Sequence, residues 1–62
     1  MDQSVAELSS VGTQLEDITR RVLDAAKEYE SDSREDVSHE LYEVERALRT
    51  ATRRLNRAVR SV

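Results

Sequence analysis

The side chains best suited to bind a metal surround the only histidine, His39. Glu35, His39 and Glu43 are spaced four residues apart, and Asp36 precedes His39 by three. On a helix this spacing brings carboxylate oxygens and an imidazole nitrogen to one face, where they can bind a transition metal. Metal sites in helical bundles use ligands that point into the core, whereas the apolar pattern described below assigns His39 to the outermost helix position. We therefore expect a solvated histidine among carboxylates and no bound metal.

No other set of residues suggests catalysis or a cofactor. The chain has no Cys, its single Gly cannot make a glycine-rich phosphate loop, and no Ser-His-Asp set can be assembled around a pocket. No apolar run approaches the roughly 20 residues of a membrane span, and the first eight residues do not resemble a secretory signal. We expect a non-enzymatic, cytoplasmic protein that holds no cofactor and does not associate with membranes.

The apolar residues predict helices. Two runs recur at alternating spacings of three and four residues, as in the a and d positions of a coiled coil, and a strand period of two fits neither run. The first run is Leu8, Val11, Leu15, Ile18, Val22, Ala25 and Tyr29, and the second is Val37, Leu41, Val44, Leu48, Ala51, Leu55, Ala58 and Val62. The polar residues 30–36 separate them, with Ser33 or Asp32 as the predicted N-cap of the second helix.

These signals predict a helix at about residues 4–30, a turn at about 31–33 and a second helix at about 34–61. A short turn makes the helices antiparallel neighbours. Pairing residues whose numbers add to 66 sets every a residue against a d residue, from Tyr29–Val37 near the turn to Leu8–Ala58 at the open end. The predicted fold is all-α: a two-helix antiparallel coiled-coil hairpin as a single unit over residues 1–62.

The start of the first helix has two interpretations. Ser4 and Thr13 each begin a capping box, and the weak helix formers Ser9, Ser10 and Gly12 lie between them. The length of the second helix favours a start near Ser4. The other interpretation leaves residues 1–12 frayed.

A hairpin of this size needs a further stabilising contact, because a single core below about 70–80 residues rarely supplies more than about 3–5 kcal/mol. Of the two flanks beside the predicted contact, one has five charged residues among 16 and the other has ten. We expect the charge-poor flank to pack against a second hairpin, giving a homodimer and a four-helix bundle; a heteromer through the same face stays open. The predicted interface residues are Val5, Gly12, Thr19, Leu23, Ala26, Tyr42, Arg49, Thr52 and Val59.

Charge is divided unevenly along the chain. All 13 acidic residues lie at or before Glu45, residues 24–45 have a net charge of −7, and residues 46–62 contain six Arg and no acid. Helix-dipole compensation and i,i+4 ion pairs account for much of this pattern. The alternative interpretation is an anion-binding stripe, formed by Arg46, Arg49, Arg53, Arg57 and Arg60.

The leading functional expectation is a small protein–protein interaction module, an adaptor or regulator that self-associates and docks a larger protein. The alternative is a small nucleic-acid-associated protein that uses the arginine stripe. It is the weaker of the two because the chain has a net charge of −3 and no aromatic residue lies near the stripe. A third possibility is a subunit that folds only inside a hetero-complex.

Overall fold

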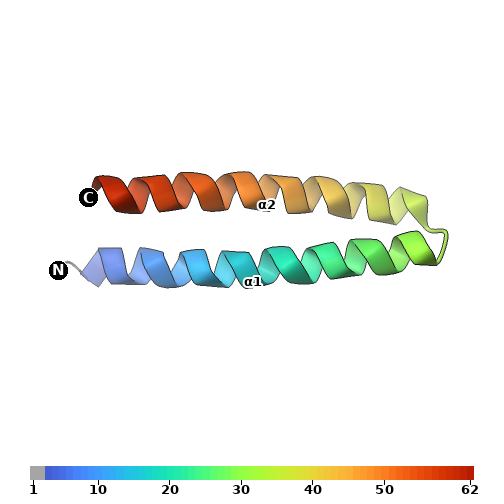
Figure 1. Ribbon diagram of the computed structural model, residues 1–62, viewed down its shortest axis with the longest axis horizontal. Helices are drawn as coiled ribbons and strands as arrows, with labels where there is room; N and C mark the ends of the chain where they lie inside the picture. The colour runs from blue at the N-terminus through green and yellow to red at the C-terminus, as the bar shows by residue number, and fades with distance from the viewer. Residues whose placement is uncertain (1–2) are drawn as a thin grey trace.

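The computed structural model describes residues 3–62, which form two long antiparallel helices joined by a tight turn (Figure 1). Helix α1 spans Gln3–Ser31 and α2 spans Glu35–Ser61, and the described residues contain no strand. The helices lie side by side with both chain ends at the same end of the molecule (Figure 1). The prediction of an all-α hairpin is therefore confirmed. Because α1 continues through Thr13 without a break, the longer of the two expected first helices is the one that forms from Gln3 onward; Met1 and Asp2 lie outside the described residues.

The hairpin is long and thin. Its Cα atoms extend over 49 × 14 × 10 Å with a radius of gyration of 14.4 Å, compared with about 11 Å for a compact domain of this length. Because the two helices touch along a single line of contact, they enclose few side chains. Among the described residues, the one buried hydrophobic side chain is that of Ala26.

The turn closes α1 with a Schellman motif. Ser33 adopts a left-handed backbone conformation with φ of 62°. The N–H of Arg34 donates to the Tyr29 carbonyl at 2.8 Å, and the N–H of Ser33 donates to the Glu30 carbonyl at 3.1 Å; these two bonds define the motif. The N-cap of α2 is Arg34, which makes no side-chain capping hydrogen bond. The predicted N-cap at Ser33 or Asp32 is therefore wrong, because both residues belong to the end of α1.

The charges at the ends of α2 suit its dipole. Glu35 and Asp36 lie in its first turn and Arg60 in its last, which places each sign of charge beside the opposite end of the helix dipole. The Arg34 guanidinium donates to Asp36 with Nε and Oδ1 3.3 Å apart. That hydrogen bond, assisted by the Val37 backbone N–H, holds the pKa of the exposed Asp36 carboxyl below its usual 3.8.

With Leu8 in α1 and Leu41 in α2 taken as position a of the heptad, the two helices meet through positions a and e, not through a and d. Ala26 is fully buried, Ser38 and Glu45 are 4% and 8% exposed, and Gly12 is also buried; all four occupy position e. The half-buried a residues complete the contact, and they are Leu8, Leu15, Val22, Leu41, Leu48 and Leu55.

The expectation that the d residues also pack between the helices holds only in part, because Ala25 and Val37 are half-buried whereas the other apolar d residues are exposed. Ile18 and Val44 are 42% and 45% exposed, and Ala51 and Ala58 are exposed as well. Since neighbouring positions on the heptad wheel are about 51° apart, each helix is turned by about one position from the predicted orientation.

Residue size explains this rotation. A Cβ added to Gly12 would lie 3.8 Å from Leu55 Cδ2 and 3.3 Å from Asn56 Oδ1, so α2 approaches closely at this point. Small residues at position e permit that approach. The e-position hydroxyls of Thr19 and Thr52 donate to carbonyls four residues earlier in the chain, at 2.6 and 2.8 Å. They are therefore satisfied within their own helices and can be enclosed without a lost hydrogen bond.

Candidate protein-interaction surface

The outward-facing d residues form an apolar surface along one side of the hairpin. Val11, Ile18 and Val44 are 38%, 42% and 45% exposed, and the half-buried a residues border them. We call this surface the open apolar face; its residues are the exposed Val11, Ile18, Val44, Ala51 and Ala58 together with the half-buried Ala25. The hairpin thus presents larger hydrophobic side chains to solvent than the alanine it encloses.

A shallow hollow lies between the helices on the open apolar face. Its lining residues are Ile18, Arg21, Val22, Ala25 and Leu41. The small side chain of Ala25 leaves space on the α1 side of this hollow. A depression bounded by several residues of a helical surface is the kind of hole that accepts a side chain from another helix.

The residues predicted for the charge-poor flank occupy two environments. Gly12 and Ala26 are buried between the helices, so they lie inside the contact that they were expected to flank. Four more residues of this set occupy position e and are half-buried: Val5, Thr19, Thr52 and Val59. The hairpin itself therefore buries two of the nine residues that the sequence suggested for a second molecule and leaves the others at least partly exposed.

Leu23, Tyr42 and Arg49 occupy position b, on the opposite side from the open apolar face. Leu23 and Tyr42 are half-buried. The Tyr42 hydroxyl donates to Glu30 Oε1 at 2.7 Å and so joins α2 to α1. Because the Glu30 carboxylate accepts this bond from the neutral phenol, it raises the pKa of Tyr42 above its ordinary 10.0. A contact of these residues with a second molecule stays a prediction.

Glu45 is a functional-looking residue that the sequence interpretation missed. Its side chain is 11% exposed, and its Oε2 lies 3.1 Å from Nε of Arg49, whose side chain is 65% exposed. Carboxylates are rarely buried to this extent unless they are paired. Because Arg49 lies four residues later in α2, the pair is formed within one helix. The signal in the sequence was its position, because Glu45 shares a heptad position with Ser38, Thr52 and Val59.

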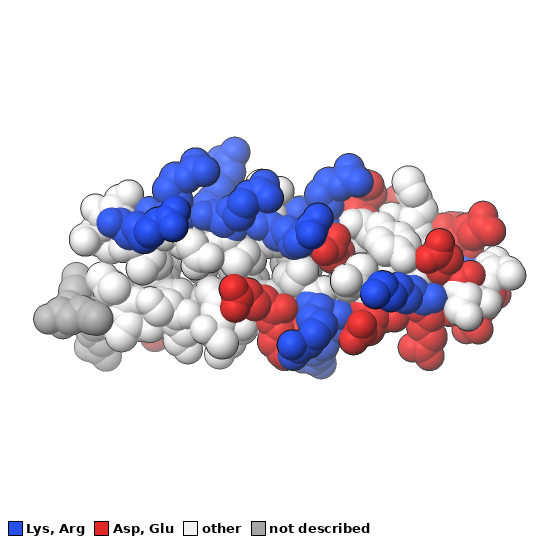
Figure 2. Space-filling view, viewed as in Figure 1, with Lys and Arg blue, Asp and Glu red and all other residues white. Residues whose placement is uncertain are grey.

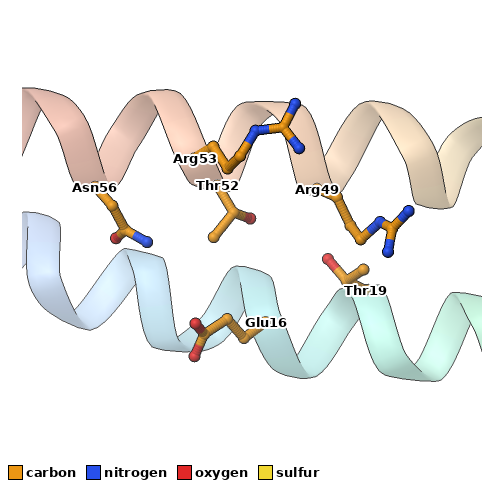
Figure 3. Close-up of a pocket in the computed structure, with 6 residues that line it drawn as sticks. All are labelled: Glu16, Thr19, Arg49, Thr52, Arg53 and Asn56. Atoms are coloured by element: carbon orange, nitrogen blue, oxygen red, sulfur yellow. The ribbon is translucent and has the colours of Figure 1, made fainter.

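A polar groove lies on the side of the hairpin that carries the b residues (Figure 3). It is lined by Glu16, Thr19, Arg49, Thr52, Arg53 and Asn56. Figure 3 shows Asn56 and Thr52 pointing from α2 toward α1, with Arg49 extending toward Thr19. Hydroxyl, amide and guanidinium groups gather here, so this side is chemically distinct from the open apolar face.

The arginine stripe covers the C-terminal half of α2, and acidic residues gather at the turn end (Figure 2). Arg46 lies 3.7 Å from Glu43 and Arg49 lies 3.1 Å from Glu45. Beyond Arg49 the sequence of α2 contains no acidic residue. Arg53, Arg57 and Arg60 are exposed, so the distal part of the stripe forms a positively charged surface.

His39 is exposed near the start of α2. Within residues that the structure describes, no group of three His, Asp or Glu side chains is placed to hold a metal ion, Glu35, His39 and Glu43 included. Neither of the two described helices combines the length and the apolar character needed to cross a membrane.

The comparisons with known proteins give no match: no protein-family model, curated protein or solved structure is similar to this chain.

Proposed function

We propose that this protein is a non-enzymatic protein–protein interaction module that self-associates as a homodimer, with an adaptor or regulator role toward a larger protein in the cytoplasm. The observation that carries the proposal is the open apolar face. Val11, Ile18 and Val44 line one side of a hairpin whose enclosed hydrophobic core is Ala26. A contiguous apolar surface of this kind on a small protein marks an interaction site.

The exposed area of the hairpin supports the same proposal. A compact monomer of 7.1 kDa has an accessible surface of about 4,100 Å², whereas the hairpin exposes 4879 Å². The excess is about 800 Å², which equals the area that one partner typically buries in a stable protein–protein interface. One further contact of ordinary size would therefore give this chain the exposure of a normal folded protein.

The test is the mass in solution, measured by light scattering, together with helicity by circular dichroism. Ile18→Glu places a carboxylate on the open apolar face and should convert the dimer to a monomer, because burying an unpaired charge is costly. Thr13→Glu adds the same charge at an exposed position of the same helix and should leave the mass unchanged. A wild-type protein with the mass of one chain would refute self-association.

Leu23→Glu distinguishes the two surfaces that could bind a second copy. Leu23 lies on the side opposite to Ile18, among the residues of the charge-poor flank. If the open apolar face is the interface, Leu23→Glu keeps the dimer mass. A monomeric Leu23→Glu beside a dimeric Ile18→Glu would instead assign the interface to the flank predicted from the sequence.

A second candidate function is association with a nucleic acid or another polyanion through the arginine stripe. The observation in its favour is the run of Arg53, Arg57 and Arg60, exposed and beyond the last acidic residue of α2. Binding of duplex DNA should then fall steeply with salt, since each phosphate contact releases counterions. Replacing all three arginines by Gln should abolish the binding, and an unchanged affinity would exclude the stripe.

A further inference from the structure

We propose that two copies of this chain pack through their open apolar faces in one particular orientation, with the two turns at opposite ends of a four-helix bundle. This inference rests on the proposed self-association and adds the face, the symmetry axis and the neighbouring residues.

The rotation of each helix has the geometry of a bundle with four members. The apolar stripe of each helix is centred between positions a and d, whereas the contact with the other helix is centred between a and e. These two directions differ by about 51° on the heptad wheel. In a square arrangement of four helices, the direction to the centre lies about 45° from the direction to each neighbour. Each helix is therefore oriented for a second neighbour on the open apolar face.

Two symmetric arrangements place the open apolar faces of two hairpins together. A two-fold axis parallel to the helices puts both turns at the same end and pairs α1 with α2 of the second copy. A two-fold axis perpendicular to the helices puts the turns at opposite ends, pairing α1 with α1 and α2 with α2. All neighbouring helices are antiparallel in both arrangements, so helix direction does not distinguish them.

Charge favours the perpendicular axis. Residues 24–45, which form the turn half of the hairpin, contain nine acids and two bases, whereas residues 46–62 contribute six Arg to the open half. Figure 2 shows this division, with acidic residues at the turn end and arginines along the far half of α2. Turns at the same end would bring two strongly acidic regions together. Turns at opposite ends place the acidic turn half of each copy beside the basic half of the other.

The apolar residues fit this arrangement layer by layer. Along α1 and its copy, a and d residues face each other when their numbers add to 33; along α2 and its copy, they do so when the numbers add to 99. In three of the seven pairs Leu then meets Ala, the large-against-small fit that close-packed cores favour, and the other four pairs join Val, Leu or Ile. The pairs are Leu8 with Ala25, Val11 with Val22, Leu15 with Ile18, Leu41 with Ala58, Val44 with Leu55, Leu48 with Ala51, and Val37 with Val62.

The same sum of 99 places Val62 against a residue of the second copy. Val62 is 82% exposed in the hairpin, and it reaches Val37 of the second copy beside the turn. Glu43, Thr50 and Arg57 share one heptad position beside the contact between α2 and α2 of the second copy. Along this flank Glu43 faces Arg57 of the second copy, so the charged residues also pair with opposite sign. Thr50 lies at the midpoint of that flank, where it faces Thr50 of the second copy.

Cysteine cross-linking tests the arrangement, and the natural chain has no Cys to interfere. Thr50→Cys should give a covalent dimer with a short bismaleimide, because the two thiols lie on the same side of adjacent helices. Glu43→Cys, one heptad earlier on the same flank, should give none by itself. A mixture of Glu43→Cys and Arg57→Cys proteins should again cross-link, in a product that contains one copy of each.

A distance between the turns gives an independent measurement. Nitroxide labels on Asp32→Cys should lie tens of ångströms apart, near the 49 Å length of the hairpin, when the turns are at opposite ends. A dimer with a short label distance and no Thr50→Cys cross-link would overturn this arrangement while leaving self-association intact. A wild-type chain that is monomeric by light scattering would overturn both.

Discussion

Ser33 holds a backbone conformation that most residues other than glycine avoid. Its φ of 62° places it at the residue that follows the end of α1 in the Schellman motif, where glycine is the usual choice. The strain arises because the Cβ of an L-residue crowds the following carbonyl in the left-handed region. The sequence offered Ser33 as an N-cap, and nothing in its residue type showed that it would terminate α1.

Ser33→Gly should therefore stabilise the protein. Relief of the left-handed strain exceeds the extra chain entropy of glycine, and the expected gain is about 0.5–1 kcal/mol in the free energy of unfolding. Urea denaturation at a fixed protein concentration measures it. Ser31→Gly, at the last residue of α1, is the matched control and should not stabilise, because Ser31 has no left-handed strain for glycine to relieve. A loss of stability in Ser33→Gly would contradict the assigned turn.

Tyr42 should titrate above its ordinary pKa of 10.0, since its hydroxyl donates to the Glu30 carboxylate. The folded state favours the neutral phenol. The contribution of this bond to stability is therefore complete below the pKa of the unfolded tyrosine and is lost as the pH rises through the folded value. Ultraviolet absorbance of the phenolate in a Tyr29→Phe background isolates Tyr42. Adding Glu30→Gln should move its pKa down; an unchanged value would show that the bond does not form in solution.

At the scale of the helices, the sequence predicted more of the fold than of the surface. The two heptad runs and the polar stretch between them were sufficient to predict two helices, their antiparallel pairing and a short turn. They did not predict which part of each apolar stripe the other helix covers. An a/d stripe such as Leu15–Ile18–Val22 is equally suited to a two-helix contact and to the centre of a four-helix bundle.

The small residues at position e distinguish a two-helix contact from the centre of a four-helix bundle. This role became visible only in the structure. Gly12, Thr19 and Ser38 read as a weakly polar outer flank when they are judged by residue type. The hydroxyls of Thr19 and Ser38 bond within their own helices, which makes these residues compatible with burial. The candidate surface consequently included Gly12 and Ala26, which the structure buries between the helices. The need for a further contact followed from chain length and is consistent with the exposed area.

Gly12 offers a test of the close helix approach. Gly12→Ala should be tolerated or stabilising by up to about 1 kcal/mol, because alanine is the better helix former and its Cβ would press only on Asn56 Oδ1, the mobile end of a side chain, at 3.3 Å. Gly12→Leu should destabilise by about 1–3 kcal/mol through overpacking against Leu55. Thermal unfolding of the two variants at equal concentration measures the difference. Equal stability of the two variants would mean that α2 does not approach α1 at this position.

The molecule as a whole is a pair of helices that leaves many of its apolar side chains exposed to solvent. The e residues pack between the two helices, the a residues are half-buried, and most of the apolar d residues are exposed on the open apolar face. In the proposed dimer, the opposite charges of the two halves would orient the second copy. Stability and association should therefore be inseparable in this protein.

That coupling predicts a melting temperature that rises with protein concentration. Unfolding of a dimer releases two chains, so mass action favours the folded state as concentration increases. Two chains of 62 residues, at about 0.7 kcal/mol of unfolding enthalpy per residue near 60 °C, give a rise of about 6 °C for each tenfold increase in concentration. Circular dichroism over a hundredfold range measures it. Thr13→Glu should keep this dependence, and Ile18→Glu should lose it together with part of its helicity. A wild-type melting temperature that stays constant over the whole range would show that the hairpin is stable alone and that its apolar face does not bind a second copy.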